Sequence, residues 1–228
     1  MKKYLLIILL LPFLISWKWP VHQSFVEHVY YNTDLKDILD LTYLKQGSIA
    51  PDKDFRDYRN HHYPNSYNLT LLWLSRAYLA YNEKNFKNAS YSFGVASHYI
   101  SDSFVSPHYI SKESSKMHGK FESQAGNLKT KCSKRQFDLK SELEKASENG
   151  KFWDTWLETY DQEIPKKQAE DSLDLVYQVA LDAFKANCKN NTTEFKKVYL
   201  VINKNVLMYS SAILTILVIL VLRKPSND

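Results

Sequence analysis

The chain has 228 residues, enough for one domain with a sizeable hydrophobic core and short appendages at both ends. Its formal net charge is +5, but 26 basic and 24 acidic residues are left once the charged terminal residues are set aside: Lys2, Lys3, Arg223, Lys224 and Asp228. This balance excludes the strongly basic surface of a dedicated nucleic-acid-binding protein, so we expect no dedicated nucleic-acid partner.

Residues 1–16 have the pattern of a secretory signal peptide: two lysines, an apolar run, and then the small residue Ser16. Cleavage after Ser16 stays open, because Leu14 is unusual three residues before such a point. Cleavage there would make Trp17 the N-terminus of an exported domain covering residues 17–188. A free α-amino group on Trp17, five residues before His22, can bind a metal ion. An uncleaved anchor with interfacial tryptophans is the alternative.

Residues 206–222 form an uncharged, Leu/Ile/Val-rich segment of the minimum length for a transmembrane helix. The basic residues Arg223 and Lys224 follow, which indicates a cytoplasmic tail at residues 223–228. We therefore expect a single-pass protein of the cell membrane, with residues 189–205 as linker and the main domain outside the cytoplasm. A buried core helix is the alternative interpretation of residues 206–222.

The main domain is predicted to be all-α, because apolar residues recur at spacings of three and four and the whole chain has only five glycines. No hairpin turn stands between alternating strands, and no glycine-rich loop could cradle a phosphate. The expected helices cover residues 34–45, 66–81, 86–102, 116–128 and 167–187. Residues 131–150 are rich in lysine and glutamate and indicate a solvated helical excursion. Trp153 and Trp156 belong to an aromatic stripe that favours core packing over a cofactor site.

Residues 47–64 are predicted to form a loop, since Gly47, Pro51 and Pro64 punctuate them. The segment is rich in acids and histidines, and a loop of this kind held between helices is a common location for binding chemistry. The candidates are Asp52, Asp54, Asp57, His61 and His62. A solvated charged loop is the alternative.

The strongest site pattern lies between His98 and Glu122. His98 and Asp102 are four residues apart, as are His118 and Glu122, and residues at that spacing share one face of a helix. His108 lies between the two pairs. Imidazole and carboxylate are ligand types that Zn²⁺ accepts. Two such pairs on consecutive predicted helices indicate a metal site far more strongly than one pair would.

The two cysteines, Cys132 and Cys188, form an even pair in a chain predicted to be exported. A disulfide between them is one expectation and two independent thiols are the other, because the sequence does not give their distance.

Four short stretches together resemble the zinc-dependent phospholipase C family: G-S-I-A-P-D at residues 47–52, N-H-H at 60–62, A-S-H-Y-I-S-D-S-F-V-S-P-H at 96–108, and M-H-G-K-F-E at 117–122. That family includes secreted bacterial enzymes that hydrolyse phosphatidylcholine and the catalytic domain of a clostridial alpha-toxin. The short spacing from Trp17 to His22 is more similar to the related fungal single-strand nucleases. The predicted transmembrane tail and the compact segment from Asp52 to His61 differ from the best-known secreted enzymes.

The resemblance implies an all-α phospholipase C-like domain that binds up to three zinc ions. It implies three ligand sets: His61, His98 and Asp102; His108, His118 and Glu122; and Trp17 with His22, with Asp102 bridging the first and third ions. His62 could replace His61 in the first set. Asp52 would be a ligand or a general base acting on the attacking water, and we take it as the catalytic residue. His28 matches no part of the pattern and is expected to be structural.

The expected function is therefore that of a membrane-anchored zinc phosphodiesterase, which hydrolyses phospholipid headgroups as a phospholipase C through a zinc-activated water. A single-strand nuclease or 3′-nucleotidase on the same scaffold is one alternative. A non-catalytic exported metal-binding protein is the other. The sequence leaves the headgroup, the lipid class and the oligomeric state open.

Overall fold

The computed structural model describes residues 19–111 and 114–189, which all fall in one compact unit of residues 1–191. Within those ranges the chain is helical, and the only β-type pairing is one isolated bridge between Thr33 and Cys188. None of the helices there is long and apolar enough to cross a membrane. The predicted signal peptide, Trp17, nearly all of the linker, the predicted transmembrane segment and the tail lie outside the described residues.

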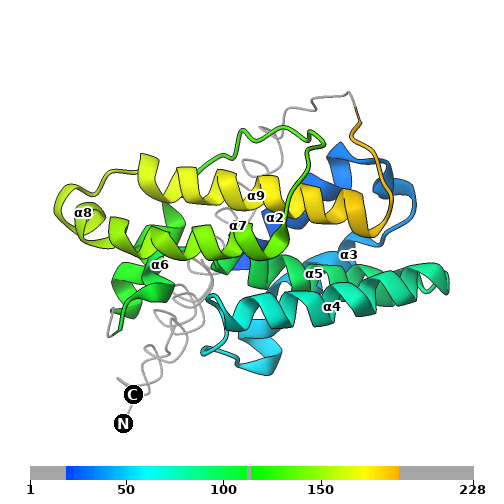
Figure 1. The fold of residues 1–228 in the computed structure, drawn as a ribbon, viewed down its shortest axis with the longest axis horizontal. Coiled ribbons are helices and arrows are strands. Elements are labelled where there is room, and N and C mark those ends of the chain that lie inside the picture. Colours follow the sequence, from blue (N-terminus) through cyan, green and yellow to red (C-terminus); the bar gives the residue numbers. More distant parts are fainter. Residues whose placement is uncertain (1–18, 112–113, 190–228) are drawn as a thin grey trace, which may run out of the picture. The chain divides into compact units, whose positions relative to one another are not determined.

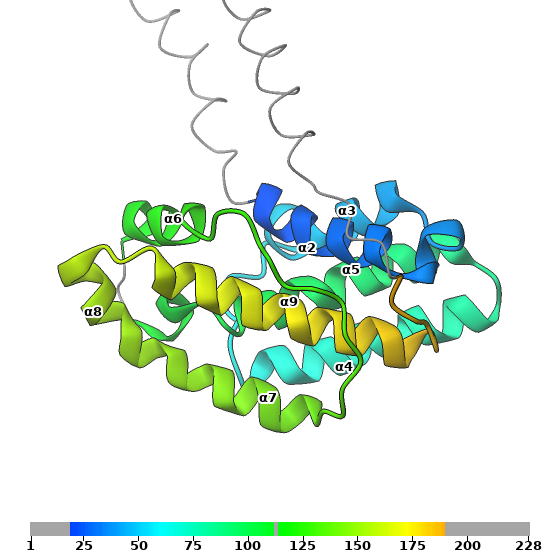
Figure 2. The same ribbon diagram turned by 90° about the horizontal axis from the view of Figure 1, so that it is seen from above.

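Helix α5 (Phe86–Asp102) is the central element of the fold, and Figures 1 and 2 show it among α3 (Leu41–Ala50), α4 (Asn65–Asn82) and α9 (Glu163–Ala183). It is buried along nearly its whole length from Ala89 onward. A helix with one strongly polar face would keep that face in contact with water. Helix α5 can be enclosed on all sides because many of its buried residues are alanine, serine and glycine, which are small and carry no charge. The result is a helix whose C-terminal end lies deep inside the domain.

Helices α3 and α5 cross at unusually close range through two glycines. A Cβ atom on Gly47 would lie 2.1 Å from the carbonyl oxygen of Tyr91, and one on Gly94 would lie 2.3 Å from that of Leu44. Only glycine fits at such a backbone approach. The prediction that Gly47 marks a loop was therefore wrong: it lies in a helix, at the crossing point.

The predicted helix at residues 34–45 was also wrong in its position. Thr33 caps a 3₁₀ turn, η2 (Asp34–Asp37), and the Asp40 side chain accepts hydrogen bonds from the backbone of Thr42 and Tyr43 to begin α3. A residue that caps the backbone in this way starts a new helix. Helix α3 then continues into a single π-type turn, η3 (Pro51–Phe55), which opens the predicted loop.

Six further helical elements complete the described chain. They are α2 (Trp19–Asn32), η4 (Ser106–Tyr109), α6 (Ser115–Ser123), α7 (Leu139–Ala146), η5 (Ser147–Lys151) and α8 (Phe152–Thr159). Helices α4 and α5 match the predicted ranges to within a residue, while α6 ends five residues early and α9 begins and ends four residues early. Trp153 and Trp156 pack with Phe121 in a small core of their own, as the aromatic stripe predicted.

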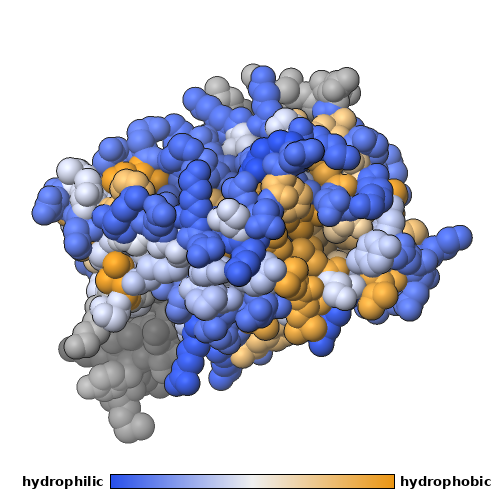
Figure 3. All heavy atoms as spheres, in the orientation of Figure 1, coloured by the Kyte–Doolittle hydropathy of each residue, from blue (hydrophilic) through white to orange (hydrophobic). Residues whose placement is uncertain are grey.

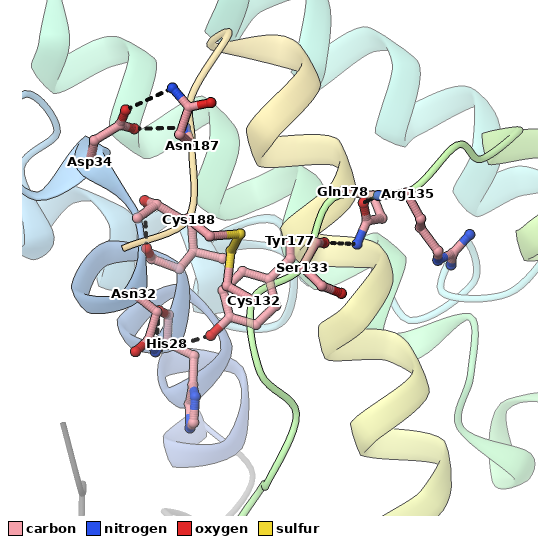
Figure 4. Close-up of a disulfide and its surroundings, with 12 residues drawn as sticks. His28, Asn32, Asp34, Cys132, Ser133, Arg135, Tyr177, Gln178, Asn187 and Cys188 are labelled. Atoms are coloured by element: carbon pink, nitrogen blue, oxygen red, sulfur yellow. Dashed lines mark hydrogen bonds between the residues drawn. A yellow bond between two sulfur atoms is a disulfide. The ribbon is translucent and has the colours of Figure 1, made fainter. Parts of the chain in front are cut away.

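A disulfide joins Cys132 to Cys188, with their Cα atoms 5.6 Å apart (Figure 4). It ties the segment after α6 to the last described residues of the domain. Beside it, the backbone N–H of Asn187 donates to the Asp34 carboxylate. Residues 131–138 are not helical as predicted, because Gln178 of α9 bonds their backbone at Ser133 and Arg135.

Candidate metal centre

Elements distant in sequence bring candidate ligands into one buried pocket. The end of α5 supplies His98 and Asp102 on one face, as their spacing predicts. The other contributors are the start of α2, the turn η3, the loop before α4, the turn η4, and helix α6. They supply His22, Asp52, His61, His108, His118 and Glu122.

The Asp102 carboxylate is the centre of this pocket. Its Oδ2 atom lies 2.7 Å from His61 Nδ1, 3.1 Å from His98 Nε2 and 3.5 Å from His108 Nε2. Its Oδ1 atom lies 3.4 Å from Nε2 of His22. Asp102 is 1% exposed, so its charge is almost fully removed from water. Burial by itself raises the pKa of Asp102, but the positive charge available on His98, His22 and His108 holds that pKa well below its usual value.

The tautomer of His98 follows from its surroundings. Its Nδ1 lies 2.8 Å from the backbone carbonyl oxygen of Ser48, which can only accept, so Nδ1 carries a hydrogen. The lone pair of a neutral His98 is therefore on Nε2 and faces the carboxylates of Asp102 and Asp52. Burial opposes a charge on His98, but Asp102 outweighs it and raises the His98 pKa to about 9. The two carboxylates therefore favour a cation at Nε2, either a proton or a metal ion.

The pKa of His22 is shifted in the opposite direction to that of His98. Its Nδ1 lies 3.0 Å from the hydroxyl oxygen of Ser101 on α5, and its ring lies 4.2 Å from the ring of His98. Burial and the proximity of His98 lower the pKa of His22 to about 4. A neutral imidazole is the form that binds a metal.

The second pair, on α6, faces the first across His108. Nε2 of His118 lies 2.9 Å from Oε1 of Glu122, and Nε2 of His108 lies 3.9 Å from that same oxygen. Turn η4 holds His108 there, because its Ser106 backbone N–H donates to Gln168 of α9 at 3.0 Å. Pro107 lies in the first turn of η4, where the chain turns away from the end of α5.

The residues fit a metal, and the clearest sign is a set of buried polar atoms without a hydrogen-bond partner in the described part of the chain. They are Nε2 of His61, His98 and His108, together with Oδ1 of Asp102. Buried polar atoms of folded proteins are almost always hydrogen-bonded, and several orphans around one point indicate an ion. The donor set, imidazole nitrogens and carboxylate oxygens, is suited to zinc.

Three groups of residues place their ligand atoms within 4.8 Å of one another: His22, Asp52 and His98; His61, Asp102 and His108; and His108, His118 and Glu122. The last group is the set expected from the resemblance. The other two divide the expected residues differently, because His98 is grouped with His22 and Asp52, while Asp102 is grouped with His61 and His108. Asp52 belongs to the pocket, with Oδ1 3.8 Å from Nδ1 of His61 and 3.8 Å from Nε2 of His98.

Other candidates from the loop lie outside the pocket. Of the adjacent histidines, His61 is 2% exposed and faces Asp102, whereas His62 packs against the ring of Tyr109. Asp54 is exposed. Asp57 accepts hydrogen bonds from Tyr99 and Asn60. His28 lies on α2 close to Asn32 and the disulfide region (Figure 4).

Three supporting residues were missed by the sequence interpretation: Ser48, Tyr99 and Ser101. Tyr99 is 1% exposed and meets the rings of His61 and His98 edge-on, at 5.8 and 5.9 Å. Its hydroxyl donates to Asp57 at 2.9 Å, which fastens α5 to the loop that carries Asp52 and His61. No spacing rule identifies such residues, because their role depends on which element lies across from them.

Comparison with known proteins adds one finding. A search among curated proteins gave no match, and a search among solved structures gave none either. The model of the zinc-dependent phospholipase C family matches residues 21–171, which is well over half of the chain. The matched range includes all eight pocket residues, from His22 to Glu122. The chain therefore belongs to the zinc-dependent phospholipase C family, and its cofactor is zinc.

Proposed function

We propose that the protein is a phospholipase C-type phosphodiesterase that hydrolyses the headgroup ester of a phospholipid. The observation that carries this proposal is the convergence of four imidazoles on one buried carboxylate, Asp102, within 3.5 Å. A site that gathers several imidazole nitrogens around one carboxylate is suited to holding several cations close together. Membership of the family supplies the substrate class, a phospholipid.

The proposed ligands are those that the sequence resemblance implies. His61, His98 and Asp102 would hold one ion and His108, His118 and Glu122 a second, while His22 would share a third with Asp102 and Trp17. Asp102 has close neighbours on both of its oxygens, which supports a bridging role. When bound, zinc lowers the pKa of water to near 7 and neutralises charge on a phosphodiester.

We assign the general-base role to Asp52. Its side chain is 19% exposed, compared with 2% for Asp102, so it lies on the more open side of the pocket. A carboxylate there can accept the proton of a water molecule that attacks phosphorus. The bond from phosphorus to the glycerol oxygen then breaks, and that oxygen takes up a proton from solvent, which releases diacylglycerol and the phosphorylated headgroup.

The test is hydrolysis by the purified, zinc-loaded chain of phosphatidylcholine, single-stranded DNA and bis-p-nitrophenyl phosphate. We expect diacylglycerol from phosphatidylcholine, loss of turnover on chelation, and recovery when zinc is restored. If no substrate is cleaved with zinc fully loaded, the protein is a metal-binding protein rather than an enzyme, and the proposal is wrong.

A nuclease remains the second candidate because aromatic rings are exposed beside the pocket. Phe55 is the last residue of the turn that carries Asp52, and Tyr58 lies three residues before His61. Exposed rings can stack on bases, as binding of single strands requires. Faster cleavage of single-stranded DNA than of any lipid would favour this alternative.

We further propose that the chain is exported and anchored in the cell membrane, with the metal domain outside the cytoplasm. The signal-like pattern of residues 1–16 and the apolar segment at residues 206–222 support this topology. Removal of the signal peptide would free the α-amino group of Trp17 for metal binding. A variant that blocks cleavage is therefore expected to hold less zinc and to turn over more slowly. Equal zinc content and turnover in processed and unprocessed protein would contradict this role.

A further inference from the structure

The segment between Asp52 and His61 turns its charged residues in two directions. Asp52 points into the metal pocket, and Asp57 bonds the Tyr99 hydroxyl. Arg56, in the left-handed conformation with φ of 53°, reverses the chain between these two acids. The backbone N–H groups of Arg56 and Asp57 both bond the carbonyl oxygen of Pro51, so the turn is closed on itself.

The outward side of this turn is consequently basic. Lys53, Arg56 and Arg59 are exposed, and Asp54 is the exposed acid among them. The printed sequence alternates acids and bases and looks balanced, but two of its three acids are directed inward. The fold thus converts a neutral stretch of sequence into a cationic rim beside the pocket.

Apolar side chains are exposed on the same turn and on α4, the helix against which the turn stacks. The ring of Phe55 is 41% exposed and stacks on Trp73 of α4, with centroids 5.6 Å apart and planes 11° apart. Tyr58 is 71% exposed. Arg76 lies over the Trp73 ring at 4.5 Å. Along α4, Leu72 and Leu79 are 45% and 56% exposed, and Figure 3 shows hydrophobic side chains gathered over this helix.

We propose that Lys53, Phe55, Arg56, Tyr58, Arg59 and Leu72 form a docking surface for an anionic lipid bilayer, which we call the rim surface. This inference rests on the proposed function, since it adds the surface by which the pocket would approach its substrate. Aromatic rings and leucines enter the interfacial region of a bilayer, and lysines and arginines are attracted to its negative surface. The aromatic stack on Trp73 holds the rim surface in place before contact, so little order is lost on docking.

A single-stranded nucleic acid is the other partner that basic and aromatic residues could bind. The aliphatic residues decide between the two. Leu72 and Leu79 recur at a spacing of seven on one side of α4, as an apolar stripe would, and leucine offers a base no stacking face. Exposed leucines beside the rings favour a lipid surface.

The test uses the full, zinc-loaded chain with an environment-sensitive fluorophore at position 58, attached through Tyr58→Cys. The chain is combined with vesicles of phosphatidylcholine alone, or of phosphatidylcholine with one third phosphatidylglycerol, each containing a doxyl-labelled quencher lipid. A second labelled chain, Asp182→Cys on α9, reports a position away from the rim surface. We expect quenching at position 58 in the anionic vesicles, weaker quenching in the neutral ones, and none at position 182.

Charge reversal provides the matched comparison. The variant K53E/R56E/R59E should lower the ratio of docked to free protein about 100-fold, at roughly fivefold for each basic residue near an anionic surface. The variant K151E/K167E/K185E makes the same change in net charge at three exposed lysines elsewhere, and it should retain docking. Equal losses in the two variants would show that only net charge matters, and would overturn the proposal.

Two further results would overturn it. One is no quenching at position 58 in any vesicle, and the other is a larger response of that probe to a single-stranded oligonucleotide than to anionic vesicles. Turnover of monomeric short-chain phosphatidylcholine is measured in parallel. Turnover without quenching would contradict the rim surface alone, whereas quenching without turnover would contradict the proposed function alone.

Discussion

The metal pocket and the disulfide end of the domain are held together in different ways. Around Asp102, several buried nitrogen and oxygen atoms have no hydrogen-bond partner in the described part of the chain. Around Cys188, the polar groups pair with one another: Asn187 bonds Asp34, Asn32 bonds the Tyr177 hydroxyl, and the disulfide closes the structure (Figure 4). The pocket has buried donor atoms that an ion would satisfy, whereas the described polar groups at the disulfide end satisfy one another. The predictions below separate these two kinds of stability.

The largest effect is expected at the centre of the pocket. Asp102→Asn should lower turnover by about 1000-fold or more and reduce the zinc content, because one neutral amide would replace the carboxylate that several ligands share. Zinc per chain is measured by atomic emission after dialysis. Asp54→Asn, an exposed acid in the turn beside the pocket, is the control and should change neither quantity. Full zinc retention in Asp102→Asn would refute the bridging role.

At the other end, replacing Cys132 and Cys188 together by serine should lower the free energy of unfolding by about 4 kcal/mol. The estimate follows from the loop entropy released when residues 56 apart are no longer linked. Urea unfolding of the zinc-loaded full chain measures this change. The folded variant should still bind zinc as the parent does, because no pocket ligand contacts the disulfide. A loss of zinc from the folded variant would show that the two regions are coupled.

A smaller change in stability is expected at the crossing of α3 and α5. Gly94→Ala should destabilise the protein by about 2 kcal/mol, because the added Cβ would lie 2.3 Å from the carbonyl oxygen of Leu44. At an open helical position the same change would stabilise by about 1 kcal/mol. The sign of the shift in melting temperature therefore tests the close crossing directly. Unchanged or increased stability would mean that the two helices are not this close.

The same contrast explains what the sequence could and could not predict. Helix α5 was placed correctly because its apolar residues and its candidate ligands both recur at a helical spacing. The range of α3 was predicted wrongly because a glycine such as Gly47 can either open a loop or permit a close helix crossing. The sequence alone does not distinguish the two. The ligands within 98–122 could be found from spacing, since one helix face carries each pair. His22 and His61 come from other elements, where no helical spacing singles them out. His61 was one of five candidates in the loop, and only the resemblance to a family assigned it and His22 to particular ligand sets.

The residues that support the candidate ligands could not be predicted from the sequence, for a related reason. Ser48 supports His98 through its backbone carbonyl, which every residue has. Tyr99 is one of 16 tyrosines, and its position on α5 does not reveal that Asp57 lies opposite. Local patterns therefore specify which residues can bind an ion. The packing of α5 against α3 and the loop specifies how those residues are oriented.

The smallest effect we predict tests that orientation. Tyr99→Phe keeps the ring that packs against His61 and His98 but removes the hydroxyl that holds Asp57. Because partners of metal ligands typically contribute 10- to 100-fold to affinity, we expect zinc affinity, measured by competition with a chelator, to fall about tenfold. The visible spectrum of the cobalt-substituted protein should change as well, since the ligand geometry is altered. Tyr177→Phe removes a buried hydroxyl from the disulfide end and is the matched control. Both variants should lose about 1 kcal/mol of stability, but only Tyr99→Phe should alter the metal site. Equal zinc affinity in the two variants would mean that Tyr99 supports the fold without orienting the ligands.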